Sequence, residues 1–327
     1  MHGFELVNDI DFYVGFYGAH PFWVGNCIDI YDSEQAKSLL GIIPDIVAEL
    51  ETEQFKAIIC VNGLMLLRIN NLAQSMPLIS DSAQFQQSVL WMDRCLDYAN
   101  ALKLCVESES IKCSHSYEVQ STATRAMEIC KVGMLHGAAV NISFERGQSQ
   151  FAIMQELSEW IVTDKKYPSP LEINGWLIPY QFITIEATRH ALETFSIVAR
   201  DEKKIRWLSY LVKAKTAYAD NDYRTSFVLS WFVIESSLRW LRKSTAPKRK
   251  ENIAVIINIL CNEGVISEAT QFLLTRLRDI RNELMHEPSE TICQPSDCKD
   301  AGQMALELAL QNSNISLISC WHSSVQF

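Results

Sequence analysis

The sequence lacks a hydrophobic run long enough to cross a membrane. Its most apolar stretch, residues 57–67, is too short and contains Asn62 and Gly63. The first nine residues, MHGFELVND, lack the basic segment and the apolar core of a secretory signal. We therefore expect a cytoplasmic protein that has no transmembrane segment and no membrane partner.

The sequence also lacks the closely spaced cysteine pairs that are typical of zinc sites. Its ten cysteines form no C-x-x-C motif, and the nearest pairs, Cys105 with Cys113 and Cys293 with Cys298, do not have zinc-site spacing. This pattern predicts free, mostly buried thiols in a reducing compartment, with no metal site and no cofactor.

Charge is distributed unevenly along the 327 residues, which are enough for one large domain or two ordinary ones. Residues 1–200 carry 13 Lys and Arg against 24 Asp and Glu, a net charge of −11. Residues 201–327 carry 16 against 15, a net charge of +1. This change predicts a boundary near residue 200 between an acidic module that repels nucleic acid and a second module that tolerates it.

Hydrophobic periodicity in residues 1–200 predicts an α+β or mostly helical region, for which we expect a sensor or regulatory role. The stretch 55–70 is compatible with a buried strand or a buried helix. The other expected elements are short strands within 4–31 and at 140–144, helices at 35–50, 85–106, 118–134, 151–163 and 179–199, and a proline-rich break at 165–170.

Residues 201–327 are predicted to be helical throughout. Helices are expected at 207–220, 223–242, from about 252 to 260, 267–286 and 296–311, with Ser296 as the N-cap of the last. The second of these is apolar almost all round, which is typical of a central, buried helix.

The stretch 273–288, LLTRLRDIRNELMHEP, predicts a helix with one apolar stripe and one polar side. Pro288 ends it near His286, because the residue before a proline avoids the helical conformation. The stripe consists of Leu273, Leu277, Ile280 and Leu284. The other side holds Arg278, Arg281, Asn282 and His286, with Leu274 and Met285 among them.

The run Arg281-Asn282-Glu283-Leu284-Met285-His286 resembles the R-x4-6-H signature of the HEPN superfamily, in which Asn follows the Arg in many members. Trp231 and Glu235 on the preceding long helix also fit that family, as does the order of helices over about residues 205–312. The resemblance implies a HEPN-like helical bundle that dimerises. It also implies a metal-independent endoribonuclease in bacterial antiviral defence or toxin-like growth arrest.

In such an enzyme Arg281 and His286 are the catalytic pair, with Asn282 orienting a phosphate or the His. The two lie about 140° apart on a helix, so two copies are needed to bring them together. His suits proton transfer at neutral pH, and Arg neutralises a phosphate. We expect Glu235 to pair with Arg278 or Arg281. Leu274 and Met285 are expected to supply apolar contacts between the copies.

A basic run precedes the third helix of this module, and we expect it to guide RNA phosphates or to lie in a solvated loop. The expected partners are RNA, a second copy of the chain, and a trigger or regulatory partner at the N-terminal region. The basic run consists of Arg239, Arg242, Lys243, Lys248, Arg249 and Lys250.

Two other readings of the C-terminal module stay open. In the first, an inactive HEPN-like bundle serves as a dimerisation or nucleotide-binding module. In the second, the chain is a structural helical adaptor, and Arg281 and His286 only balance the dipole at a helix C-terminus.

Overall fold

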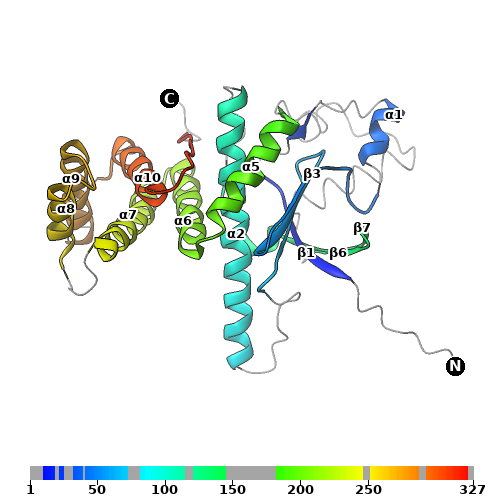
Figure 1. The fold of residues 1–327 in the computed structure, drawn as a ribbon, viewed down its shortest axis with the longest axis horizontal. Coiled ribbons are helices and arrows are strands. Elements are labelled where there is room, and N and C mark those ends of the chain that lie inside the picture. The colour runs from blue at the N-terminus through cyan, green and yellow to red at the C-terminus, as the bar shows by residue number, and fades with distance from the viewer. Residues whose placement is uncertain are drawn as a thin grey trace. The chain divides into compact units, whose positions relative to one another are not determined.

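The structure, a computed structural model, describes residues 10–18, 22–25, 32–39, 41–72, 82–114, 121–144, 182–245, 251–286 and 292–322. The chain divides into two compact units, Met1–Arg200 and Asp201–Phe327. The first unit combines a sheet with helices, and the described part of the second is helical (Figure 1). The chain is thus mainly α, with an α+β N-terminal unit.

An antiparallel sheet forms the centre of the first unit. In its described part, six strands lie in the order β3-β4-β5-β1-β6-β7, and β2 (Trp23–Val24) pairs in parallel with β8 (Phe182–Ile183). The stretch 55–70 forms strands rather than a helix. The strands are β1 (Asp11–Phe16), β3 (Ile46–Glu51), β4 (Phe55–Cys60), β5 (Met65–Ile69), β6 (Cys130–Leu135) and β7 (Ala138–Phe144).

Both faces of this sheet are buried along β4. On one face Phe55 contacts Phe195 of α5 (Ile185–Val198), with ring centroids 4.7 Å apart. Helix α5 also packs against α2 (Ser82–Ser114). On the other face Ile58 belongs to a second buried apolar cluster. Burial on two faces explains why the stretch reads as a continuous apolar run, without the alternation of a half-exposed strand.

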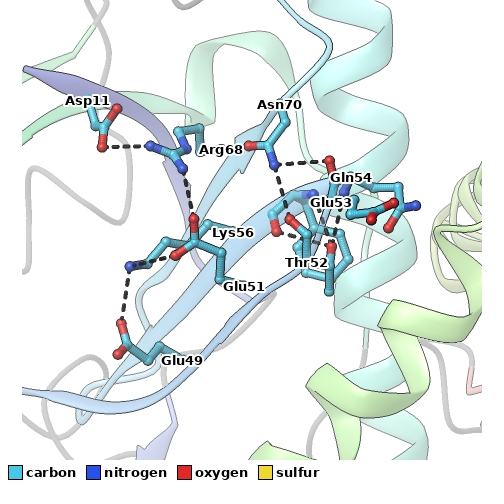
Figure 2. Close-up of polar contacts among 10 residues, drawn as sticks. Asp11, Glu49, Glu51, Thr52, Glu53, Gln54, Lys56, Arg68 and Asn70 are labelled. Carbon is cyan, nitrogen blue, oxygen red and sulfur yellow. Dashed lines mark hydrogen bonds and ion pairs between the residues drawn. The ribbon is translucent and has the colours of Figure 1, made fainter.

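Ion pairs occupy one end of the second face. Lys56 Nζ lies 3.6 Å from Glu49 and 3.3 Å from Glu51, and Arg68 lies 2.6 Å from Asp11 and 3.2 Å from Glu51 (Figure 2). Register places Lys56 opposite Glu51 on β3 and opposite Arg68 on β5. Lys56 thus lies against two acids of the neighbouring strand β3, and Arg68 contacts Asp11 on the neighbouring strand β1 and Glu51 two strands away. These acids offset the repulsion between Lys56 and Arg68, which lie directly opposite each other.

The expected helix at 118–134 is wrong. Residues 121–125 form an irregular segment along α2, and β6 follows from Cys130. Buried polar side chains of α2 hold this segment: Asn100 Oδ1 accepts from Thr124 N at 2.8 Å, and Glu107 accepts from Ser121 N. Backbone groups fixed in this way cannot enter a helical ladder.

Two other helix predictions for the first unit, at 35–50 and 179–199, are wrong in part. Asp32 caps α1 (Ser33–Ala36), but the helix continues only as the 3-10 turn η1 (Lys37–Leu39) before β3 begins at Ile46. Helix α5 begins after its N-cap Thr184, later than predicted. The predicted helix at 85–106 and strand at 140–144 are confirmed by α2 and β7. The predicted helix at 151–163 and break at 165–170 lie outside the described residues.

The described helices of the second unit follow the expected order. Helix α10 packs against α6 and α7, and α8 and α9 pack against each other and against α7. The central helix is α7, which buries Phe227, Trp231 and Leu238. The helices are α6 (Glu202–Ala219), α7 (Tyr223–Thr245), α8 (Ile253–Asn262), α9 (Glu268–His286) and α10 (Pro295–Leu310).

The start of α10 differs from the prediction, because Gln294 is the N-cap and Pro295 the first helical residue. Ser296 therefore lies inside the first turn. The chain after α10 packs back on this helix, with Trp321 only 8% exposed. A side chain at Gly302 would collide with the Trp321 ring, so the missing Cβ makes room for the indole.

Candidate functional site

Helix α9 presents a buried side and a polar side that meet along its length. Leu274, Leu277 and Leu284 are buried, whereas the predicted stripe residues Leu273 and Ile280 are half-buried. The core-facing side is rotated because α9 packs against α7, α8 and α10 together. Since Leu274 is fully buried, the prediction that it contacts a second copy is wrong.

Helix α7 carries a ladder of three side chains, Trp231, Glu235 and Arg239, spaced one turn apart. Trp231 Nε1 donates to Glu235 Oε2 at 3.3 Å, and Arg239 Nη2 donates to Glu235 Oε1 at 2.7 Å. The prediction that Glu235 pairs with Arg278 or Arg281 is wrong. Residues four apart on a helix are neighbours, so Arg239 of the same helix reaches the carboxylate first.

The N-terminus of α8 faces the same region. Asn252 caps it, with Oδ1 accepting from Ala254 N at 2.7 Å. Arg239 Nη1 also donates to the carbonyl oxygen of Glu251 at 3.3 Å, so the ladder on α7 is tied to the residue just before this cap. The positive end of the α8 dipole and the Arg239 guanidinium thus lie close together.

A pocket of about 480 Å³ lies where these three helices meet. Helix α7 lines the pocket with Trp231, Glu235 and Arg239, and α8 lines it with its N-cap and first two residues. Helix α9 contributes three residues that the sequence analysis had singled out. The lining consists of Trp231, Glu235, Arg239, Asn252, Ile253, Ala254, Arg278, Arg281 and Asn282.

The lining contains three guanidinium groups and one carboxylate, so it carries an excess of positive charge. Arg239 is neutralised by Glu235, and Arg278 contacts Asp279 beside it at 2.6 Å. Arg281 Nη1 contacts Asn282 Oδ1 at 3.2 Å, and among the described residues it forms no ion pair. Its charge is therefore available to an anion that enters the pocket.

His286 does not line this pocket. It is the exposed last residue of α9, about 140° around the helix from Arg281. Met285 is 58% exposed, one turn beyond Arg281. The structure thus gathers Arg278, Arg281 and Asn282 with Glu235, and leaves His286 outside this group.

The predicted basic run is divided in the structure. Arg239 lines the pocket, whereas Arg242 pairs with Glu251 at 2.7 Å and with Glu263 at 3.3 Å. Two acids neutralise Arg242, and these ion pairs connect α7 to both ends of α8. Lys243 is exposed, and residues 248–250 lie outside the described part of the chain.

Sequence reasoning did not assign a site role to Asn252, Ile253 or Ala254. The signal was present, because an Asn before an apolar run is a typical N-cap. The sequence did not indicate that this N-cap lines the same pocket as residues of α9, because the direction of a short helix depends on its packing.

No protein-family model, curated protein or solved structure matches this chain. Among the described residues, no group of three or more His, Cys, Asp or Glu side chains is placed to hold a metal ion. Within the same part of the chain, no helix combines the length and hydropathy needed to span a membrane.

Proposed function

We propose that the chain is a HEPN-type, metal-independent endoribonuclease whose active site is completed at a homodimer interface. One observation carries the proposal. The pocket of the second unit unites Arg281 and Asn282 of the R-x4-H run with Glu235 of the Trp231–Glu235 pattern. Glu235 is 46 and 47 positions from Arg281 and Asn282 in the sequence, and all three residues belong to the patterns that resemble the HEPN superfamily.

The pocket supports a phosphate site within each copy. Arg281 and Arg278 provide donors for non-bridging phosphate oxygens, and the α8 N-terminus favours the same charge. In the reaction the ribose 2′-oxygen bonds to the adjacent phosphorus and the bond to the 5′-oxygen breaks. A base removes the 2′-hydroxyl proton, and an acid protonates the departing 5′-oxygen. Arg281 stabilises the charge that develops on the phosphate.

His286 serves as the proton-transfer group, and its position supports a dimer. It lies on α9 but outside the pocket of its own chain, so a second copy must bring a histidine to the phosphate. Met285 is exposed, and in the proposed dimer it contacts that copy. A two-fold axis beside the ends of two α9 helices would give two equivalent composite sites.

The biological setting follows from the resemblance alone. We propose a role in bacterial antiviral defence or toxin-like growth arrest, in the cytoplasm. Residues 1–200 would sense a trigger or bind a regulatory partner and, through a net charge of −11, repel RNA until activation.

The test is cleavage of total RNA and of transfer RNA with EDTA present. Arg281→Ala and His286→Ala should each lower the rate by at least about 100-fold. Lys203→Ala is the matched control, because Lys203 is an exposed cation near the start of α6, outside both the pocket lining and the basic run, and this variant should cut at the wild-type rate. Mass measurement of each variant checks that the dimer is unchanged.

A mixing experiment tests the composite site. If each site takes Arg281 from one copy and His286 from the other, a heterodimer of the two inactive variants contains one intact site. Mixed and re-equilibrated variants should therefore regain part of the wild-type rate. No cleavage by the wild-type chain or by residues 201–327 alone would refute the enzyme proposal.

A binding module is the second candidate, and the position of His286 favours it. The pocket is complete without that residue, and its volume falls within the range of small-molecule sites. In this case the bundle dimerises or binds a nucleotide without cutting RNA. Nucleotide binding that Arg281→Ala abolishes and His286→Ala leaves unchanged, with no cleavage, would support it.

A further inference from the structure

Two cysteines meet at the start of α10. Cys293 precedes the N-cap Gln294, and Cys298 is the fourth residue of the helix. Side chains at these two positions commonly touch across the first turn. Pro295 fixes the backbone between them in the conformation of a helix start. The Cys293 and Cys298 sulfur atoms lie 3.5 Å apart.

The environment makes the two thiols unequal. Cys298 is fully buried, and its Sγ donates to the carbonyl oxygen of Tyr223 at 3.0 Å, whereas Cys293 keeps 8% of its surface exposed. The S–H group of Cys298 can turn from the Tyr223 carbonyl oxygen to a Cys293 thiolate, and this contact lowers the pKa of Cys293. Arg224 adds to this effect on the pKa, although burial and Asp297 oppose it. The same contact and burial raise the pKa of Cys298.

Other described cysteines lack this arrangement. Burial raises the pKa of Cys95 and of Cys130 to about 12, mainly because the thiolate would lose its hydration. Among the described cysteines, no other pair has its sulfur atoms in hydrogen-bond contact. Cys293 is therefore the buried thiol best suited to react, and Cys298 is already beside it.

We propose that Cys293 and Cys298 form a reversible dithiol–disulfide site that exchanges with small disulfides of the glutathione type. Cys293 is the attacking thiol and Cys298 the resolving thiol. The assignment rests on the sulfur–sulfur contact and on the difference in exposure. It does not depend on the proposed ribonuclease function.

The exchange balances as follows. The Cys293 thiolate bonds to one sulfur of the small disulfide, the sulfur–sulfur bond of that molecule breaks, and one small thiolate leaves. Cys298 then bonds to the Cys293 sulfur and expels the second small thiolate. The two protons from the protein thiols end on the two released small thiols. The protein is oxidised by two electrons, and the small disulfide is reduced by two.

Oxidation also removes a contact between helices. The Cys298 thiol links α10 to the first residue of α7 through the carbonyl oxygen of Tyr223. A disulfide has no S–H group, so this carbonyl loses the thiol as a donor when the bond to Cys293 forms. The reduced and oxidised proteins therefore differ at the contact between α7 and α10.

The experiment uses the full chain, first reduced and then equilibrated with glutathione and glutathione disulfide at graded ratios. The protein is quenched in acid, alkylated with N-ethylmaleimide and digested with trypsin. Residues 282–299 form one tryptic peptide, because no Lys or Arg lies between Arg281 and Lys299, and it contains both cysteines. We expect this peptide to become lighter by two hydrogens and to resist alkylation as glutathione disulfide increases.

Single variants identify the two roles. In Cys298→Ser the glutathione adduct on Cys293 should accumulate at least about tenfold over wild type, because the resolving thiol is missing. In Cys293→Ser the peptide should stay free of glutathione. Cys261→Ser and Cys320→Ser remove partly exposed thiols of the same unit and should leave the internal disulfide unchanged.

The proposal is overturned if the wild-type peptide stays doubly alkylated at the most oxidising ratio while exposed Cys113 in the same sample carries glutathione. A stable adduct on Cys293 of the wild type, or a bond from Cys293 to another cysteine, would also overturn it. The wild-type result decides the matter even if a variant fails to fold.

Discussion

Lys103 is a buried lysine in the middle of α2, only 4% exposed. Its Nζ donates to Thr124 Oγ1 at 3.0 Å, within the group of polar side chains that fixes residues 121–125. Burial lowers its pKa to about 8, although Glu128 and Glu107 oppose the shift. The lysine thus helps to hold an irregular segment at the cost of burying a charge.

This lysine predicts a pH dependence of stability. Its pKa is lower in the fold than in the unfolded chain, so between about pH 8 and 10.5 this lysine binds more protons in the unfolded chain, and its own contribution to stability rises with pH. Lys103 should contribute a rise of about 3 kcal/mol over this range. Urea unfolding at the two ends of the range measures it. Lys103→Met should remove this contribution, so the stability of the variant should rise less, or fall more, with pH than that of the wild type, and an unchanged slope would contradict the assignment.

Lys112→Met is the control for that experiment. Lys112 lies on the same helix, but it is exposed and pairs with Glu109 at 2.7 Å. Because burial is the cause of the effect at Lys103, this second substitution should leave the slope with pH close to that of the wild type.

At the scale of elements, Phe195 joins α5 to the sheet and to α2. It is fully buried, with its ring 4.7 Å from Phe55 and 6.2 Å from Tyr98, centroid to centroid. Phe195→Ala should lower the free energy of unfolding of the first unit by about 3–5 kcal/mol, because it leaves a cavity between three elements. Urea unfolding followed by circular dichroism measures the loss.

Leu90→Ala provides the comparison for Phe195. Leu90 lies on α2 but is 67% exposed, so its truncation should change stability by less than about 0.5 kcal/mol. Equal losses for the two substitutions would show that α5 does not depend on this contact.

At the scale of the whole molecule, the two units carry unequal charge. The net charge is −11 in residues 1–200 and +1 in residues 201–327. If RNA binds the second unit, the full chain should bind it more weakly than residues 201–327 alone, by about tenfold at low salt. The difference should shrink as salt rises, because screening weakens repulsion between the first unit and RNA.

Fluorescence anisotropy of a labelled RNA measures both affinities. Residues 1–200 added as a separate chain are the control, since at low concentration they should leave RNA binding to the second unit unchanged. Equal affinities of the full chain and the second unit at low salt would mean that the acidic unit does not repel RNA.

The sequence by itself determined the positions of the helices of the second unit, including the bounds of α9. Their periodicity and breaks are local, so α6 to α10 lie close to the predicted ranges. It also singled out Arg278, Arg281, Asn282 and Glu235, and all four line one pocket, although Glu235 pairs with Arg239 rather than with Arg278 or Arg281.

Only the tertiary structure decided which groups meet. The partner of Glu235, the burial of Leu274 and the contact of Cys293 with Cys298 depend on packing or on the geometry of a helix start. The stretch 118–134 was mistaken for a helix because side chains of α2, distant in sequence, hold part of its backbone. Burial and long-range hydrogen bonds override local propensity, and the amino-acid order alone does not show where they act.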